Sequence, residues 1–98
     1  MSPDRSAIIA VISKFKSGLM VKYAVSRIGI FGSVARGEAG EESDIDIVVE
    51  MEPDLFKRAA LKSELEELLH RNVDVVRYSK RMNPSLKQRI DRDALYVL

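Results

Sequence analysis

The sequence predicts an α+β fold, in which a small mixed β-sheet of three to four strands packs on helices. Short runs of alternating or β-branched apolar residues predict the strands, and longer segments with apolar residues at helical spacing predict the helices. The chain has 98 residues, which is the size of one domain. We therefore expect a single domain over residues 1–98.

The first helix is predicted at the start of the chain. Ser2 can cap it, Pro3 suits its first position, and Asp4 favours the positive helix end. A core-facing stripe follows at helical spacing: Ile8, Ile9, Ile12, Phe15 and Leu19. Gly18 is the predicted stop, although the apolar pattern reaches Leu19.

Residues 24–31 are rich in β-branched and apolar side chains and predict a mostly buried strand that ends at Gly32. Gly29 inside this run indicates either the close approach of another backbone or ligand, or a weak point in the strand. A short helical segment, Ser33 to Arg36, follows. Gly37 ends this helical segment, and residues 38–43 are predicted to form a polar loop.

The second strand is predicted from Asp44 to Glu50, where the sequence alternates with a period of two. Asp44, Asp46 and Val48 share one face of this strand. The other face carries Ile45, Ile47 and Val49. A strand that places two carboxylates on one face gives up burial there, so we expect these positions to face solvent or an ion.

The longest helix is predicted to open at Pro53 and Asp54 and to run to about Arg71. Its apolar set is Leu55, Ala59, Leu61, Leu65, Leu68 and Leu69. His70 falls in its last turn, where the helix dipole favours a histidine. The chain has no second histidine, so we expect this dipole role for His70 and not metal binding.

Residues 73–78 predict a third strand, and its second residue is Asp74. Asn83 and Pro84 then open a short helix as cap and first residue. The inner side of that helix is predicted to carry Leu86 and Ile90. The tail, residues 94–98, is predicted to finish as a short edge strand.

The composition excludes several classes of protein. Hydrophobic residues make up 46% and charged residues 32%, which is typical of a globular domain and not of a disordered chain. There is no cysteine, so disulfides and thiolate metal sites are excluded. No apolar run approaches the roughly 18 residues of a membrane span, and no signal-peptide pattern opens the chain. We expect no membrane partner and a cytoplasmic location.

Charge is unevenly distributed along the chain. From Glu38 to Asp54 there are eight acidic residues and no basic one. From Arg77 to Arg92 there are six basic residues, and the one acidic residue is Asp91. The acidic band repels a polyanion unless cations intervene, and the basic band attracts one. A metal-dependent enzyme that acts on phosphates needs both bands. Two solvated faces that balance each other are the alternative.

The carboxylates of Asp44 and Asp46 leave the same strand face about 6.5 to 7 Å apart at the backbone and can converge on one site. Two carboxylates this close repel each other unless they are protonated or bridged by a cation. Magnesium fits, because it prefers carboxylate oxygens, water and substrate phosphates. Asp74 supplies a third ligand if the third strand lies beside the second.

Gly32 and Ser33 suit the phosphate end of such a site. Glycine lets the backbone approach a phosphate, and the Ser33 amide and hydroxyl add donors. Arg36 either reaches a phosphate or pairs with an acidic neighbour. Ser43 is expected to brace the loop before Asp44 by bonding a backbone group. Arg77 and Lys80 follow the third strand and can contact the triphosphate or a partner.

This arrangement resembles the polymerase-β-type nucleotidyltransferase superfamily, whose pattern is Gly-Ser, a short helix, Asp-x-Asp and a third Asp on a later strand. The stretch GSVARGEAGEESDIDIVV, which begins at Gly32, matches without a gap, and NVDVV around Asp74 matches the strand with the third acid. The resemblance covers residues 7–98. The length is similar to that of the minimal nucleotidyltransferases, which carry the catalytic core alone.

The resemblance implies a catalytic and metal-binding triad of Asp44, Asp46 and Asp74 and nucleotide binding by Gly32, Ser33, Arg36 and Ser43. Minimal nucleotidyltransferases are typically encoded beside a small helical HEPN protein. In characterised pairs the HEPN protein is a ribonuclease toxin, and the nucleotidyltransferase neutralises it by transferring AMP from ATP to a tyrosine. The implied cofactor is one or two Mg²⁺ ions, and the implied assembly is a hetero-oligomer with a HEPN toxin in a type VII-like toxin–antitoxin module.

Two other functions stay open. The acceptor hydroxyl can belong to a small molecule, although relatives of that kind usually carry an extra domain. The chain can also be a non-catalytic antitoxin that neutralises its partner by binding, although the intact acidic triad speaks against this. A domain of this size has no surface for a nucleic-acid template, so processive polymerisation is not expected.

Overall fold

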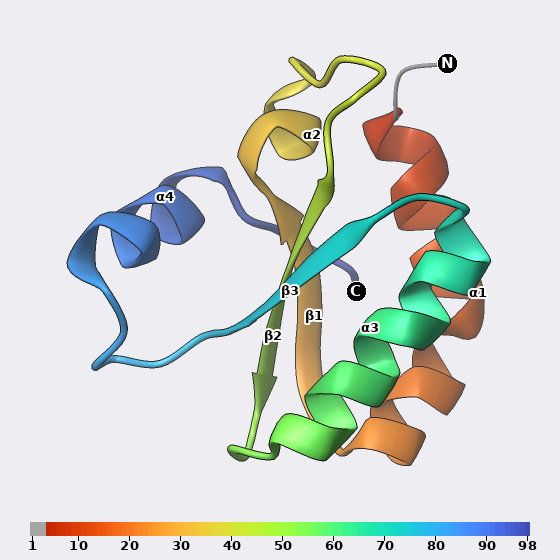
Figure 1. Cartoon of the computed structure of the whole chain (residues 1–98), viewed down its shortest axis with the longest axis vertical. Helices are drawn as coiled ribbons and strands as arrows, with labels where there is room; N and C mark the ends of the chain where they lie inside the picture. The colour runs from red at the N-terminus through yellow and green to blue at the C-terminus, as the bar shows by residue number, and fades with distance from the viewer. Residues whose placement is uncertain (1–3) are drawn as a thin grey trace.

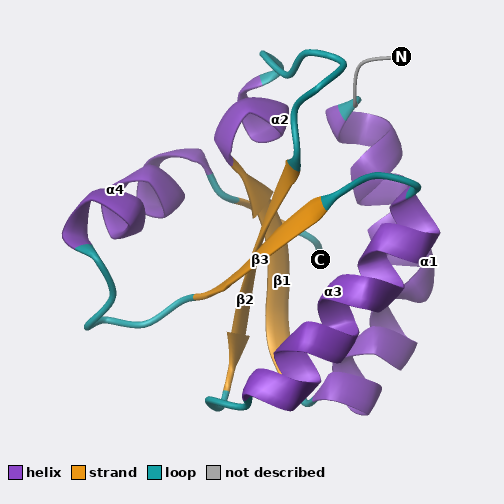
Figure 2. Cartoon of the chain, viewed as in Figure 1, coloured by secondary structure: helices purple, strands orange, loops and turns teal. Residues whose placement is uncertain are grey.

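The computed structural model describes residues 4–98 and confirms the α+β prediction (Figures 1 and 2). The elements in chain order are α1 (Arg5–Tyr23), β1 (Val25–Phe31), α2 (Gly32–Arg36), β2 (Ile45–Met51), α3 (Leu55–Leu69), β3 (Val73–Arg77), α4 (Pro84–Asp93) and β4 (Leu95–Tyr96). No helix in this part of the chain is long and apolar enough to cross a membrane.

The four strands form one mixed sheet in the order β3-β2-β1-β4. β1 pairs antiparallel with both β2 and β4, and β2 pairs parallel with β3. A parallel pair needs a crossover connection, and α3 provides it. The register places Asp46 opposite Phe31 on one side and Asp74 on the other. The three strands that carry the predicted motif are therefore adjacent in the sheet.

Helices cover both faces of the sheet, α1 and α3 on one and α4 on the other (Figure 1). The larger core lies under α1 and α3 and includes Ile12, Ile47 and Leu65. A smaller core lies under α4 and consists of Phe31, Val48 and Ile90, with partly buried neighbours. Val48, which was grouped with the two aspartates, is buried by α4. Only the first part of that face, at Asp44 and Asp46, is left for polar chemistry.

The first helix follows Asp4 and ends later than predicted. Asp4 is the N-cap, where its side chain accepts a hydrogen bond from the Ser6 amide; the predicted roles of Ser2 and Pro3 lie outside the described residues. The predicted stop at Gly18 is wrong, because α1 continues to Tyr23 and ends at left-handed Ala24. Burial of Leu19 and Tyr23 holds this last turn on the core.

The predicted core-facing residues of α1 and the predicted longest helix also differ from the structure. Phe15 is 40% exposed and does not belong to the core. With 19 residues, α1 is longer than α3, which has 15 and ends at Leu69 and not at Arg71. Leu55 is 72% exposed, so the α3 core face begins later, at Leu61 and Leu65. His70 caps the end of α3 in a left-handed conformation.

The C-terminal predictions are confirmed. Asn83 caps α4 by accepting a hydrogen bond from the Leu86 amide, and Pro84 is its first residue. The tail pairs with β1 as the edge strand β4. Gly29 marks this contact, because a Cβ there would lie 2.7 Å from the Leu95 carbonyl oxygen. The predicted close approach at Gly29 is therefore that of a backbone, β4 itself.

Candidate active site

The three predicted carboxylates come together at one end of β2 and β3. Asp44 directly precedes β2, Asp46 is its second residue, and Asp74 is the second residue of β3. Asp46 and Asp74 are direct partners in the parallel register, so their side chains leave the same face of the sheet. The strand that carries Asp74 therefore lies beside the second strand, as its predicted role as a third ligand requires. Asp44 and Asp74 are exposed, and Asp46 is half-buried.

The electrostatics of Asp46 reflect this crowding. Burial raises the pKa of the Asp46 carboxyl, and the neighbouring charges of Asp74 and Asp44 raise it further. Arg89 and Arg36 act in the opposite direction and lower that pKa. Both burial and like charges disfavour the ionised carboxylate. A cation placed among these carboxylates would relieve the repulsion.

The carboxylates are also unengaged. Across residues 4–98, the side chains of Asp44, Asp46 and Asp74 accept no hydrogen bond and form no ion pair. The same described residues contain no group of three His, Cys, Asp or Glu side chains that is already gathered around one point as a metal site. Binding an ion therefore requires the exposed Asp44 and Asp74 side chains to turn inward, and no competing partner holds them.

Gly32 shapes the other wall of the site. It has a φ of +72°, and a Cβ on it would lie 2.3 Å from Oδ2 of Asp46. Only a residue without a side chain allows the turn between β1 and α2 to pass this close to the carboxylate. Ser33 follows immediately as the second residue of α2. The donor set of three carboxylates and this glycine cradle fit a hard divalent cation with a phosphate ligand.

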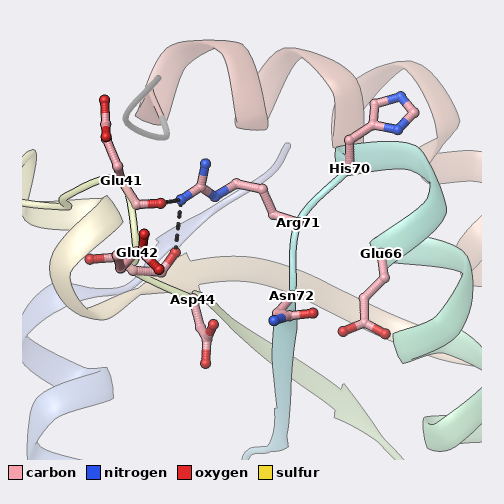
Figure 3. A pocket seen from close by; sticks show the side chains of 8 residues that line it. Glu41, Glu42, Asp44, Glu66, His70, Arg71 and Asn72 are labelled. Carbon is pink, nitrogen blue, oxygen red and sulfur yellow. Dashed lines mark hydrogen bonds between the residues drawn. The ribbon is translucent and has the colours of Figure 1, made fainter.

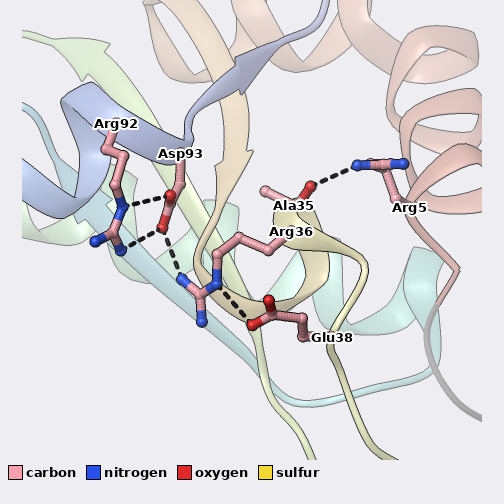
Figure 4. A network of polar contacts seen from close by, with 6 residues as sticks. All are labelled: Arg5, Ala35, Arg36, Glu38, Arg92 and Asp93. Atoms are coloured by element: carbon pink, nitrogen blue, oxygen red, sulfur yellow. Dashed lines mark hydrogen bonds and ion pairs between the residues drawn. The ribbon is translucent and has the colours of Figure 1, made fainter.

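Arg36 takes the second of its two predicted roles in this structure (Figure 4). Its guanidinium pairs with Glu38 at 3.0 Å and with Asp93 at 2.7 Å, which ties α2 to α4. Arg92 also pairs with Asp93 at 2.8 Å, and the pKa of the Asp93 carboxyl falls to about 2, through Arg92 first and then Arg36. The nucleotide-binding role of Arg36 stays a prediction.

The loop before Asp44 is held from two sides, and Figure 3 shows the hydrogen bonds from Arg71. Ser43 Oγ accepts a hydrogen bond from the Gly40 amide at 3.0 Å, which confirms the predicted brace. Arg71 donates through Nη2 to the carbonyl oxygens of Glu41 and Ser43. An open pocket of about 490 Å³ lies between this loop and the start of β3. Nucleotide binding by Ser43 stays a prediction.

Arg71 and Arg89 are the residues that sequence reasoning missed. Arg71 appeared there only as the end of a helix. Arg89 lies on α4, and its charge reaches Asp46. A signal for it existed, because Arg89 follows Leu86 by three residues and so lies near the inner side of the predicted helix. Arg77, by contrast, lies three residues beyond Asp74 along β3, about 10 Å away.

Comparison with known proteins agrees with this geometry. The family model described as a nucleotidyltransferase domain matches residues 12–97. A Methanocaldococcus jannaschii protein provisionally named a protein adenylyltransferase, MJ0128, is 44% identical over 94 residues, which cover 94% of this chain and 96% of the relative. The protein adenylyltransferase MntA of Thermococcus cleftensis is 38% identical over 92 residues, which cover 92% of each chain.

Solved structures show the same fold. One described as a provisional minimal nucleotidyltransferase aligns with a TM-score of 0.75 at 38% identity and covers 94% of both chains. The complex of a tri-AMPylated Shewanella oneidensis HEPN toxin with its MNT antitoxin aligns with a TM-score of 0.68 at 23% identity, covering 96% of this chain and 71% of that one, a likeness of fold alone. With its family match, its relatives and the Gly32–Asp46–Asp74 site, the chain belongs to the nucleotidyltransferase domain family and is a nucleotidyltransferase of the minimal type.

Proposed function

We propose that this nucleotidyltransferase transfers AMP from ATP to a tyrosine hydroxyl of a HEPN ribonuclease toxin and acts as its cytoplasmic antitoxin. The observation that carries the proposal is the register of β2 and β3, which sets Asp46 beside Asp74, with no hydrogen bond or ion pair to either carboxylate from residues 4–98. Two relations support the choice of AMP and of a protein acceptor. MntA of Thermococcus cleftensis is named a protein adenylyltransferase, and a protein of similar fold occurs in complex with an AMPylated HEPN toxin.

The residues that would hold magnesium, as one or two ions, are Asp44, Asp46 and Asp74. When bound, Mg²⁺ neutralises charge that develops on the phosphates and lowers the pKa of the attacking hydroxyl. Asp46 is the central ligand, because it is two residues from Asp44 along the chain and is the cross-strand partner of Asp74. The raised pKa of the Asp46 carboxyl is the expected state of this cluster before it meets a cation.

The phosphates of ATP are bound at Gly32 and Ser33. The glycine lets the turn between β1 and α2 pass close to the Asp46 carboxylate, and Ser33 supplies an amide and a hydroxyl donor. The tyrosine oxygen then forms a bond to the α-phosphorus, and the bond from this phosphorus to the bridging oxygen of the β-phosphate breaks. Pyrophosphate leaves with that electron pair. The phenolic proton passes to Asp74, which is the exposed carboxylate on the outer strand.

A ribonuclease assay tests this proposal. The HEPN protein encoded beside this chain is incubated with the nucleotidyltransferase, ATP and magnesium, and its ribonuclease activity is then measured. We expect loss of activity only when ATP and magnesium are both present, and no loss with the double variant Asp44→Asn, Asp46→Asn. Full neutralisation by the double variant would identify a binding antitoxin, and unaffected toxin with the wild type would reject the proposal.

A further inference from the structure

We propose that the acceptor protein docks on a surface formed by the first half of α3 and the outer edge of β3, and that it does so through an acidic segment with an apolar anchor. We call this the α3/β3 docking surface, and it comprises Leu55, Arg58, Ala59, Lys62, Asp74, Val75 and Arg77. The inference rests on the proposed function, because it concerns the acceptor of that transfer.

The geometry of the reaction favours this side of the molecule. In phosphoryl and nucleotidyl transfer the attacking and leaving oxygens are roughly in line on opposite sides of the phosphorus. Pyrophosphate leaves on the side of Gly32 and Ser33, which follow β1. The sheet order β3-β2-β1 places Asp46 in the middle and Asp74 on the far strand. The acceptor hydroxyl therefore arrives across β3.

Two shallow grooves lie along this side of the molecule and meet at α3. One, of about 230 Å³, is lined by α3 residues including Leu55 and Arg58 together with Asp74 and Val75 of β3. The other, also about 230 Å³, is lined by Leu55 and Arg58 together with Arg77 and the turn before α3. The first groove reaches a residue of the proposed catalytic triad. A segment bound there would contact the outer edge of β3 at Asp74, whose side chain leaves the sheet on the face covered by α4.

Leu55 is the apolar feature of this surface. It lines both grooves and is 72% exposed, although Leu61 and Leu65 of the same helix are fully buried. The next residue, Phe56, is 90% exposed. Two adjacent large apolar side chains left in water on one helical turn are suited to a partner's apolar residue.

Charge identifies the kind of partner. Arg58, Lys62 and Arg77 line the grooves. Lys62 pairs with Glu66 at 3.1 Å, whereas Arg58 forms no ion pair with any residue between 4 and 98. Apart from Asp74, the one acidic residue in the grooves is Asp54, whose carboxylate caps α3 by accepting a hydrogen bond from the Lys57 amide. A second copy of this chain would set these cations against each other. An acidic segment complements them.

The backbone of β3 adds donors and acceptors. Asn72 accepts a hydrogen bond from the Ile45 amide, and the Tyr78 amide donates to Val49, so even-numbered residues bond toward β2. In a parallel ladder the intervening residues point their amides and carbonyls the other way. Glu66 accepts from the Val73 amide at 3.0 Å. The peptide groups of Val75, which lines the first groove, face the open edge and can bind a partner's backbone.

The test compares Leu55→Asp with Val21→Asp in AMP transfer to the neighbouring HEPN protein. Val21 is 85% exposed on α1, so the two variants lose a similarly exposed aliphatic side chain on different helices. We expect the KM for the HEPN protein to rise by about tenfold or more with Leu55→Asp, and the KM for ATP to stay unchanged. Val21→Asp should match the wild type. Arg58→Glu should raise the same KM, and Arg58→Lys should restore most of it.

Binding is measured separately, by calorimetry with the HEPN protein in the absence of ATP. Weaker binding by Leu55→Asp alone supports the surface even if no AMP is transferred, and that result would reject only the proposed function. AMP transfer with an unchanged KM in Leu55→Asp and Arg58→Glu would overturn the surface and leave the function intact. Equal losses in Leu55→Asp and Val21→Asp would also overturn it. A HEPN protein that neither binds nor accepts AMP would reject both.

Discussion

Replacing Gly32 by alanine tests the central contact of the site, because it changes one carbon at a defined place. The new Cβ would lie 2.3 Å from Oδ2 of Asp46, whereas ordinary contacts begin at 3.4 Å. The carboxylate must therefore move by about 1 Å, and a displacement of that size in an active site can cost about 10²-fold in rate. The φ of +72° adds roughly 1–2 kcal/mol of backbone strain.

Gly37→Ala is the matched control for this substitution. Gly37 has a φ of +73° at the other end of α2, and a Cβ there would meet no atom within 4 Å. Both variants should lose about 1–2 kcal/mol in free energy of unfolding, measured by urea denaturation. Only Gly32→Ala should lose about 10²-fold in kcat for AMP transfer. Equal activity losses in the two variants, or wild-type activity in Gly32→Ala, would refute the reasoning.

Three further predictions concern residues around the site. Asp93→Asn should lower the free energy of unfolding, measured by urea denaturation, above pH 3.8. The difference from wild type should close as the pH falls toward about 2, where the folded carboxyl takes up its proton. A difference in free energy of unfolding that persists at pH 2 would contradict this. Arg71→Met frees the loop before Asp44 and should lower kcat about tenfold with little change in the KM for ATP. Arg71→Lys should recover part of that loss. A wild-type kcat in Arg71→Met would contradict the prediction. Arg89→Gln should raise the KM for ATP about tenfold, whereas Arg81→Gln should not, and equal values for the two would remove Arg89 from the site.

Much of the fold followed from local patterns. The alternation in residues 44–50 and the apolar run in 73–78 identify strands because a period of two and a short run of β-branched apolar residues are both typical of strands. Asn83 with Pro84 identifies a helix start because each has a specific role in the first turn. The end of α1 was missed because Gly18 is a helix stop only where the chain has no reason to continue. Burial of Tyr23 supplied that reason, and it depends on tertiary contacts.

The sequence predicts which residues belong to the site, but it does not predict how all of them are arranged in space. Asp44 and Asp46 share a face because a strand has a period of two, which the sequence shows directly. That Asp74 lies beside Asp46 depends on the parallel register of two strands separated by a helix, which no local pattern encodes. The clamp by Arg71 and the approach of Arg89 depend on how a loop and a helix pack, and for that reason they appeared only in the structure.

The central claim is that AMP is transferred to the HEPN protein at the Asp44, Asp46 and Asp74 site. The most direct measurement is the intact mass of the neighbouring HEPN protein after incubation with this chain, ATP and magnesium, followed by peptide mapping of the modified residue. We predict a mass increase of one or more AMP units on tyrosine, which is absent with Asp44→Asn, Asp46→Asn. An unmodified HEPN protein in the wild-type reaction, or the same mass increase with the double variant, would contradict the claim.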